Sequence, residues 1–475
     1  MAEEKNNLLN IYKRLKGNEE DIKFRYVDNG EVFEVSDDRY YHDINKLIHR
    51  LNELKKDGYS NFGILSENSY EFYTLFMAAL LSKTMITMLN IMEKPEIVME
   101  DIKRAGVNYL FVGKEVANSV GSCLSGELNS ELLLIPDRTE EEVIDFPYED
   151  LFKPSMIFFT SGTTGSKKAV LLCPNNFFAS PYTVFVSELG DVFAGKRRSL
   201  LLALPAYHVG GICGFQSVLF NDGTVHISNM RNTFTELKLM PSDYSATVPA
   251  VIKLWQTALK RGKPEKLGGI KYIYSGAASM EGVDIDLYKK YGIKIRQTYG
   301  MTETGGRGTV NLGDDFMSQG MPGEMSEIKI SNEGEVLVKS AGNMVGYLDN
   351  EEETKDIYEN GWIHTGDLGR LDEEGKLWIT GRIKNLIILS GGENVSPEQI
   401  EKDLYSNSDI SECFVYAKVD RIYADIYCDP EKRDSVKIFV NEYNAKSPIF
   451  RRIKAVNFVD EGFEKGHTGK LIRRK

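Results

Sequence analysis

The chain has 475 residues, too many for one ordinary hydrophobic core, so we expect several structural units. Its formal net charge of −12 argues against a general surface for nucleic acid, and we expect no nucleic-acid partner. The five cysteines are scattered and contain no Cys-x-x-Cys pair, which indicates neither a disulfide framework nor a zinc site. The polar, acidic start and the shortness of the best apolar run, residues 72–81, predict a cytoplasmic protein that does not span a membrane.

The first part of the chain alternates helix-like and strand-like segments. Apolar residues at helical spacing predict a helix between Arg39 and Gly58, where the glycine ends it. The alternation that follows is typical of a mainly parallel α/β sheet. We expect strands at 62–65, 85–89, 109–112, 156–159, 199–204, 272–274 and 335–339, with helices through residue 80 and over 95–105.

The pattern changes near Gly381, where a sheet-rich region gives way to a compact tail. The tail contains one clear helix over 396–405, with Ser396 as N-cap and Pro397 at its first position. We therefore expect an N-terminal domain of residues 1–381 and a C-terminal domain of residues 382–475. The predicted fold class is α/β: a large N-terminal domain of mixed and parallel sheets layered with helices, plus a small α+β C-terminal domain.

A loop rich in glycine and hydroxyl side chains follows the strand predicted at 156–159. Its glycines let backbone N–H groups turn toward an anion, and its hydroxyls and lysines add donors and charge, so it is suited to hold phosphate. It is not a Walker A loop, because its glycines are too close together and no hydroxyl follows either lysine. A polar surface turn is the alternative. The loop reads Thr160-Ser161-Gly162-Thr163-Thr164-Gly165-Ser166-Lys167-Lys168.

Four further motifs place polar or charged residues beside glycines. Taken singly, each is explained as well by a surface ion pair or a solvated lysine. In chain order they are Tyr299-Gly300-Met301-Thr302-Glu303-Thr304, Gly361-Trp362-Ile363-His364-Thr365-Gly366-Asp367, Gly381-Arg382-Ile383-Lys384-Asn385 and Gly466-His467-Thr468-Gly469-Lys470.

In this order and at these separations, the loop and the four motifs resemble the superfamily of adenylate-forming enzymes. This superfamily contains acyl- and aryl-CoA synthetases, which the chain resembles most, adenylation domains of peptide synthetases and firefly-type luciferases. The resemblance spans nearly the whole chain. It implies that a small carboxylic acid attacks the α-phosphate of Mg-ATP to give an acyl-adenylate and pyrophosphate, and that a thiol then displaces AMP. ATP, Mg²⁺ and CoA are the cofactors and co-substrates it implies.

The resemblance also implies roles for individual residues. The loop from Thr160 to Lys168 would hold the β- and γ-phosphates. Lys470 would lie against the α-phosphate and the carboxylate, where charge builds in the first transition state. The other implied contacts are Glu303 to Mg²⁺, Thr302 to the α-phosphate, Tyr299 with Gly276, Ala277 and Ala278 to adenine, and Asp367 with Arg382 to the ribose.

The segment around His208 resembles the one that lines the acid pocket in that superfamily. His208 is either a pocket or gate residue or a buried structural histidine. No aspartate follows it to pair an ammonium group, so a fatty or aryl acid is favoured over an amino acid, and an o-succinylbenzoate-type acid remains open. The predicted pocket consists of His208, Val209, Gly210, Gly211, Thr247, Gly300 and Met301. The other histidines show no metal spacing.

For the acceptor, Gly391 and Gly392 resemble a turn beside the pantetheine tunnel of CoA ligases and favour CoA. Loading of a carrier protein in trans is the same-chemistry alternative, and a non-catalytic nucleotide-binding homologue is the other. Lys384 matches the hinge position, which implies a mobile small domain that rotates between the half-reactions. The chain departs from the superfamily pattern at Lys83, where glycine is usual, and at Lys167, which would make the loop more cationic.

Overall fold

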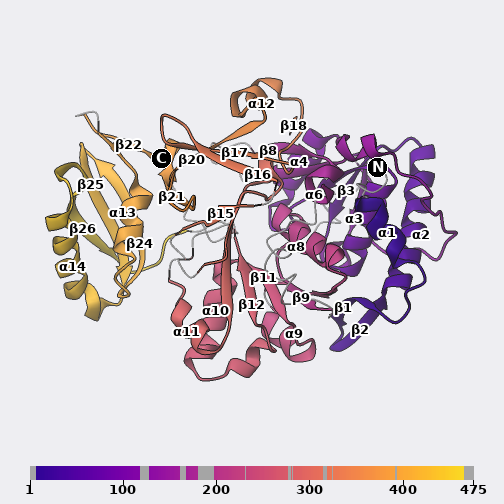
Figure 1. Ribbon diagram of the computed structural model, residues 1–475, viewed down its shortest axis with the longest axis horizontal. Coiled ribbons are helices and arrows are strands. Elements are labelled where there is room, and N and C mark those ends of the chain that lie inside the picture. Colours follow the sequence, from indigo (N-terminus) through magenta and orange to yellow (C-terminus); the bar gives the residue numbers. More distant parts are fainter. Residues whose placement is uncertain are drawn as a thin grey trace.

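The computed structural model describes residues 7–117, 128–160, 167–179, 197–230, 232–276, 280, 282–313, 318–323, 325–390 and 393–464. Two large sheets dominate it (Figure 1). The first has the order β18 (Gly346–Tyr347), β8 (Lys168–Leu172), β7 (Met156–Thr160), β4 (Met85–Met88), β3 (Asn61–Leu65), β5 (Tyr109–Val112) and β6 (Asn129–Leu132). Its strands run parallel from β7 to β6, and β8 and β18 add an antiparallel edge.

The second sheet has nine strands and is parallel in its centre. Its order is β15 (Met321–Pro322), β14 (Thr309–Asn311), β13 (Lys294–Tyr299), β12 (Tyr272–Ser275), β11 (Tyr244–Thr247), β9 (Ser199–Leu202), β10 (Thr224–Ile227), β1 (Ile22–Asp28) and β2 (Glu31–Ser36). The parallel run extends from β13 to β1, and both edges are antiparallel.

Helices fill the space between the two sheets and cover their outer faces. The largest hydrophobic cluster joins strands of both sheets to α1 (Asn7–Leu15), α2 (Asp37–Lys56), α3 (Tyr70–Leu81) and α8 (Val209–Phe220). A second cluster packs α9 (Thr233–Leu239), α10 (Pro249–Lys260) and α11 (Ile285–Lys290) on the other face of the nine-stranded sheet. A third packs α4 (Pro95–Ala105) on the other face of the seven-stranded sheet. The order of layers is therefore helix, sheet, helix, sheet, helix.

Helix α3 shows how sequence composition decides position in these layers. It is apolar on nearly all sides, and 11 of its 12 residues are buried, the exception being Glu71 in its first turn. A helix with no polar face must be covered all round, and the space between two sheets provides that cover. Among the helices in the described part of the chain, none is both long and apolar enough to cross a membrane.

The predicted α/β architecture is confirmed, and the local predictions differ from it mainly at element ends. The helix expected between Arg39 and Gly58 is α2, which is capped by Ser36 and ends at Lys56. The helix over 95–105 is α4. The strand expected at 199–204 ends at Leu202, because the chain leaves the sheet there and turns toward α8. The antiparallel edge strands were not predicted.

The remaining elements follow the two large sheets. A five-stranded sheet contains β16 (Ser326–Ile330), β17 (Glu335–Ser340), β20 (Trp362–Leu371), β19 (Tyr358–Glu359) and β21 (Leu377–Arg382), with α12 (Glu351–Ile357) beside it. Beyond it, β22 (Ile387–Ile388), β23 (Asn394–Val395), β24 (Ile410–Lys418), β25 (Arg421–Cys428) and β26 (Ile453–Val459) accompany α13 (Pro397–Leu404) and α14 (Arg433–Lys446). Figure 1 shows these last elements, in yellow, at one end of the molecule. They have a hydrophobic cluster of their own.

Lys83, which stands where the superfamily usually has glycine, has a strained backbone conformation. Its φ is +56°, in the left-handed region that a side chain disfavours, just after α3 ends. Its ammonium lies 2.5 Å from Asp150 Oδ2 and 5.6 Å from the centre of the Phe146 ring. These contacts offset part of the backbone strain.

The buried imidazole of His226 on β10 predicts an acid-sensitive stability. Burial, with a smaller contribution from Arg25, lowers the pKa of His226 to about 4, and Nδ1 lies 2.8 Å from Ser242 Oγ. Between pH 6.5 and 4 the unfolded chain therefore binds a proton that the folded chain does not, so stability falls as pH falls. His226→Gln should remove up to about 3 kcal/mol of this loss. Urea unfolding of both proteins across this range measures it, and equal slopes would contradict the prediction.

Candidate active site

Three of the predicted nucleotide-binding segments begin at the carboxyl ends of parallel strands, one in the seven-stranded sheet and two in the nine-stranded sheet. Strand β7 ends at Thr160, β12 at Ser275 and β13 at Tyr299. Crevices at this edge of α/β sheets are common ligand sites, because loops and helix N-termini converge there. Thr160 also pairs in register with Lys168, whose N–H donates to Thr160 Oγ1 at 3.4 Å, so the phosphate loop begins and ends at one point.

A carboxylate, a guanidinium and a phenol form the first cluster. Asp367 on β20 faces Arg382 on β21 in register, and Arg382 Nε lies 2.6 Å from Asp367 Oδ1. The hydroxyl of Tyr299 donates to Asp367 Oδ2 at 2.8 Å. Asp367 is 5% exposed, so its charge is held by these two partners rather than by water. Burial, with the Asp367 charge adding to it, raises the pKa of Tyr299 well above its ordinary value and keeps it a donor.

Glu335 supports the turn that carries Asp367. Its Oε1 accepts the N–H of Gly366 at 2.9 Å, and its Oε2 lies 2.8 Å from Nδ1 of His364. Gly366 has φ of +70°, which explains the glycine in the Thr-Gly-Asp motif. Thr365 Oγ1 then accepts the Asp367 N–H at 3.1 Å. Each of these bonds restricts the direction of the carboxylate.

A second cluster surrounds Glu303 in the short helix η4 (Thr302–Thr304). Glu303 is 6% exposed, and the hydroxyl of Tyr347 donates to its Oε1 at 2.9 Å. Lys168 Nζ lies 4.7 Å from the centre of the Tyr347 ring and 3.5 Å from Glu353 Oε2. Burial raises the pKa of Glu303, and its hydrogen bonds and the nearby cations of Lys168 and Arg382 oppose that shift. A buried carboxylate of this kind is stabilised by a further positive charge.

Lys167 does not make the phosphate loop more cationic, contrary to expectation. Its ammonium lies 2.8 Å from Asp101 Oδ2 and 3.1 Å from Glu93 Oε1, both near or on α4. The side chain is 18% exposed. Its charge is therefore matched locally, and among the described residues of the loop Lys168 is the lysine beside Glu303's cluster.

The predicted acid wall is the first turn of α8. His208 is the residue before the helix, and its ring lies 4.7 Å from that of Tyr207. The helix reaches the Glu303 segment, because Cys213 Sγ lies 3.3 Å from the carbonyl oxygen of Gly305. A Cβ added to Gly306 would lie 2.9 Å from Cys213 Sγ. The acid wall and the Glu303 segment are thus in direct contact.

The two glycines of this wall differ in what surrounds them. A Cβ on Gly211 would lie 2.3 Å from the carbonyl oxygen of Pro205, whereas one on Gly210 would meet only Leu204, at 3.5 Å. We expect Gly210→Ala to change the free energy of unfolding by less than about 1 kcal/mol and Gly211→Ala to lower it by about 2 kcal/mol or more. Urea unfolding of the pair tests this, and equal losses would show that Gly210 is also packed.

Other predicted residues lie at the same edge with different surroundings. A Cβ on Gly276 would meet Thr298 Oγ1 at 2.4 Å, and one on Gly300 would meet the Gly306 carbonyl at 2.6 Å, so both glycines allow close backbone approach. Thr247 is fully buried at the end of β11. Its neighbour Ala246 packs in the cluster that contains α8, so the alternation of the strand directs Thr247 to the opposite face. Its place in the acid pocket stays a prediction.

Several predicted residues lie outside the described part of the chain. They are Ser161, Gly162, Thr163, Thr164, Gly165, Ala277, Ala278, Gly391, Gly392 and Lys470. Thr302 begins η4, Met301 precedes it, and Val209 opens α8. Lys384 lies in the short helix η5 (Ile383–Asn385), between β21 and β22.

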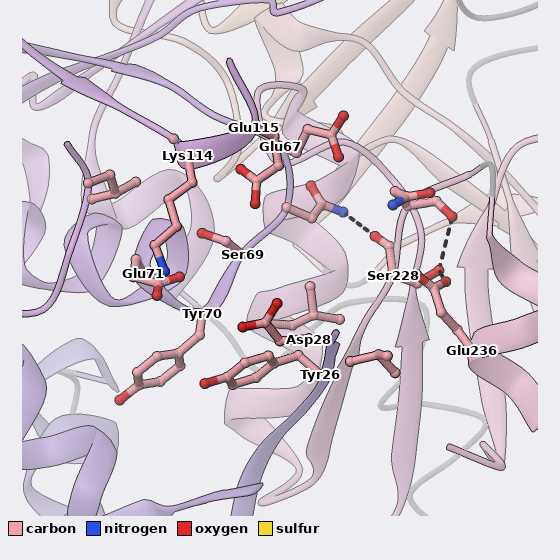
Figure 2. A pocket seen from close by; sticks show the side chains of 16 residues that line it. Tyr26, Asp28, Glu67, Ser69, Tyr70, Glu71, Lys114, Glu115, Ser228 and Glu236 are labelled. Carbon is pink, nitrogen blue, oxygen red and sulfur yellow. Dashed lines mark hydrogen bonds between the residues drawn. The ribbon is translucent and has the colours of Figure 1, made fainter. Parts of the chain in front are cut away.

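A cavity of about 200 Å³ lies elsewhere, beside the start of α3 (Figure 2). Figure 2 shows acidic side chains around it, and Ser228 Oγ donates to the carboxylate of Glu236 on one wall. None of the predicted site residues lines it. Its lining of Asp28, Glu67, Glu71, Glu115 and Glu236 makes it a poor site for an anionic nucleotide or acid.

Tyr347 and Glu335 were not predicted from the sequence. Each supports a predicted acidic residue from a distant segment: Tyr347 is 44 positions from Glu303, and Glu335 is 31 from Gly366. For Tyr347, the local sequence offers only the neighbouring Gly346, and this pair does not indicate a contact with Glu303. The contact with Glu303 depends on the antiparallel pairing of β18 with β8.

Comparisons with known proteins agree with this arrangement. The model of the family "AMP-binding enzyme" matches residues 16–348. A 2-succinylbenzoate–CoA ligase of Bacillus cereus strain Q1 is 30% identical over 322 residues, which are 63% of this chain and 66% of that protein. The 2-succinylbenzoate–CoA ligase of Listeria innocua is 26% identical over 425 residues, which are 88% of this chain and 87% of that protein.

A solved structure shares the fold. The o-succinylbenzoate coenzyme A synthetase of Bacillus subtilis, in complex with ATP and magnesium ion, superposes with a TM-score of 0.80 at 22% identity, covering 98% of both chains. The predicted fold class and superfamily are thereby confirmed, and the relatives' names agree with the predicted class of acid–thiol ligase. This chain belongs to the AMP-binding enzyme family.

Proposed function

We propose that the protein is an AMP-forming acid–CoA ligase that acts on an aryl carboxylic acid, with 2-succinylbenzoate as the first candidate. The observation that carries this function is the meeting, beyond the carboxyl end of β13, of the Tyr299–Asp367–Arg382 cluster with the buried Glu303 and helix α8. The Asp367 cluster offers polar contacts for a nucleotide, and Glu303 offers a negative charge for a cation. Helix α8 provides an apolar wall. ATP and CoA as substrates fit a cytoplasmic enzyme.

The first cluster suits the ribose of ATP. An ionised carboxylate only accepts hydrogen bonds, and the two ribose hydroxyls are donors. Arg382 and Tyr299 fix the direction of the Asp367 oxygens and lower the cost of keeping that charge buried. Adenine would lie beside Tyr299 and Gly276, where the absence of a side chain on Gly276 permits close approach.

Glu303 suits Mg²⁺. The ion usually binds proteins through one or two carboxylates and otherwise through water and substrate phosphates. Among the described residues no group of three or more His, Cys, Asp or Glu could hold a metal alone, and Glu303 is a buried carboxylate beside the phosphate loop. When bound, Mg²⁺ would neutralise the charge of the ATP phosphates. Tyr347 holds one carboxylate oxygen of Glu303, and Lys168 adds positive charge nearby.

The reaction proceeds in two halves. A carboxylate oxygen of the acid attacks the α-phosphorus of ATP, the bond to pyrophosphate breaks, and an acyl-adenylate forms. Lys470 would stabilise the negative charge on the oxygens of that transition state, and Thr302 would contact the α-phosphate. The CoA thiolate then attacks the carbonyl carbon, and AMP leaves with the electron pair of its bond to the acyl group.

The aryl acid is supported by three observations. The related ligases of Bacillus and Listeria are named for 2-succinylbenzoate. No aspartate follows His208 to pair an amino group. The first turn of α8 is apolar, and Gly210 has space beside it where a ring could pack.

The order of elements along the chain supports a division into two domains joined by a hinge. Residues 1–381 form the domain that binds ATP and acid, and residues 382–475 form a small domain that carries Lys470. The separate hydrophobic cluster of the last elements supports this division. Lys384, just after β21, is the proposed hinge. Gly391 and Gly392 are the proposed lining of the thiol path.

A direct assay tests the function and its alternatives. The protein is incubated with ATP and Mg²⁺ and with 2-succinylbenzoate, benzoate, anthranilate or fatty acids, with and without CoA. Formation of an aryl-CoA thioester together with AMP supports the proposal. An adenylate that forms but is not transferred to CoA favours a stand-alone enzyme that loads a carrier protein. Binding of ATP with no release of AMP in any mixture would identify a non-catalytic homologue.

A further inference from the structure

Asn68 joins the two large sheets through its side-chain amide. Its Nδ2 donates to the carbonyl oxygens of Leu204 at 2.9 Å, Ser228 at 3.0 Å and Leu202 at 3.4 Å. Its Oδ1 accepts the N–H of Ala206 at 2.8 Å. Asn68 precedes α3 in the connection from the seven-stranded sheet, and the other four residues end or follow strands of the nine-stranded sheet. One amide therefore binds four backbone groups 134 to 160 positions away.

Two of those bonds hold the turn that leads to the acid wall. Leu204 and Ala206 lie between the end of β9 and His208, the residue before α8. Within this turn the N–H of His208 donates to the carbonyl of Pro205 at 3.1 Å, and the N–H of Gly211 donates to the carbonyl of His208 at 3.0 Å. Asn68 ties this turn to the connection that leaves the seven-stranded sheet.

The same turn is mechanically connected to the Glu303 segment. Helix α8 touches Gly305 through Cys213 Sγ, and Gly305 follows η4 directly. Tight packing transmits small shifts, because protein interiors have few voids to absorb them. A shift of the turn would therefore move His208 and the wall relative to Glu303 and the reacting atoms.

We propose that Asn68 is a positioning residue for the acid: its amide fixes the turn before α8, and so sets the distance between the acid wall and the nucleotide. The inference rests on the proposed function. Misplacement of a bound reactant by about 1 Å can cost about 10²-fold in rate. The effect should therefore appear on the acid and leave ATP binding unchanged.

Direct contact of Asn68 with the acid is disfavoured by its surroundings. Asn68 is one of the residues that line the cavity of about 200 Å³ beside the start of α3. Figure 2 shows the carboxylates of Glu67, Glu71, Glu115 and Asp28 around this space. An anionic acid would be repelled there, so Asn68 acts through the turn.

The kinetic test compares Asn68→Ala with Asn61→Ala. Asn61 is a matched control, because its amide also bridges distant groups, accepting from Thr87 Oγ1 at 3.1 Å and donating to the Ala105 carbonyl, but it lies at the other end of β3. We expect Asn68→Ala to lower kcat/KM for the acid about 10²-fold, with a fall in kcat, and to leave the KM for ATP within about 2-fold. Asn61→Ala should leave both unchanged at a similar loss of Tm. Equal behaviour of the two variants would overturn the proposal.

Hydrogen exchange separates this inference from the proposed function. In the wild-type protein the Ala206 amide should exchange slowly, and Asn68→Ala should raise its rate while Asn61→Ala does not. If the wild type activates no acid, the proposed function fails. The exchange measurement still shows whether Asn68 fixes the turn before α8. Asn68→Ser, which retains one donor and one acceptor, replaces the alanine variant if that does not fold. An unchanged Ala206 rate in the folded variant would overturn the inference.

Discussion

We expect replacement of Lys470 by alanine to lower the rate of acyl-adenylate formation by about 10²–10³ or more and to leave transfer from supplied acyl-adenylate to CoA close to wild type. In the proposed reaction its ammonium would stabilise the negative charge that builds on the α-phosphate and carboxylate oxygens. The second half-reaction does not include attack at the α-phosphorus, because the thiolate attacks the carbonyl carbon and AMP leaves. The split is measured by pyrophosphate release on one side and by thioester formation from chemically prepared adenylate on the other.

Lys465→Ala is the matched control for this experiment. Lys465 lies five positions earlier in the same glycine-containing segment, so its loss removes the same charge from the same region. It should leave both half-reactions within about 2-fold of wild type. Loss of the second half-reaction in Lys470→Ala, with the first intact, would reverse the assignment.

The sequence predicted much of the fold because its local signals were strong. Helix α4 was predicted with the observed bounds: Pro95 occupies the first turn and Gly106 ends the helix with φ of +67°. The interior strands were short apolar runs, as expected for strands covered on both faces. Edge strands such as β2 and β15 gave little signal, because one side of an edge strand meets solvent and its residues are mixed.

The candidate site was predictable in part for a different reason. Asp367, Glu303 and Tyr299 lie in short motifs whose order along the chain was informative. Their supporting partners were not predictable, because Tyr347 and Glu335 reach them only through strand pairing. The charge of Lys167 likewise depended on Asp101, a residue 66 positions away on α4. Local sequence indicates which groups are present, and packing decides which of their charges remain available.

The second large effect is expected at Glu303. Glu303→Gln keeps the size of the side chain and its contact with Tyr347 but removes the negative charge. We expect acyl-adenylate formation to fall about 10²–10³-fold and the Mg²⁺ concentration for half-maximal rate to rise, because a neutral amide is a weak ligand for a hard cation. Pyrophosphate release measured across a Mg²⁺ series gives both quantities.

Two other variants serve as comparisons for Glu303→Gln. Tyr347→Phe removes one hydrogen bond to Glu303 and keeps the charge, so its effect should be smaller, about 10-fold. Asp367→Asn removes a buried charge from the neighbouring cluster and should raise the KM for ATP with little change in the Mg²⁺ requirement. If Glu303→Gln and Asp367→Asn showed the same Mg²⁺ dependence, Glu303 would not be the cation ligand. A raised Mg²⁺ requirement confined to Glu303 and Tyr347 would instead establish that the buried carboxylate and the phenol act as one unit.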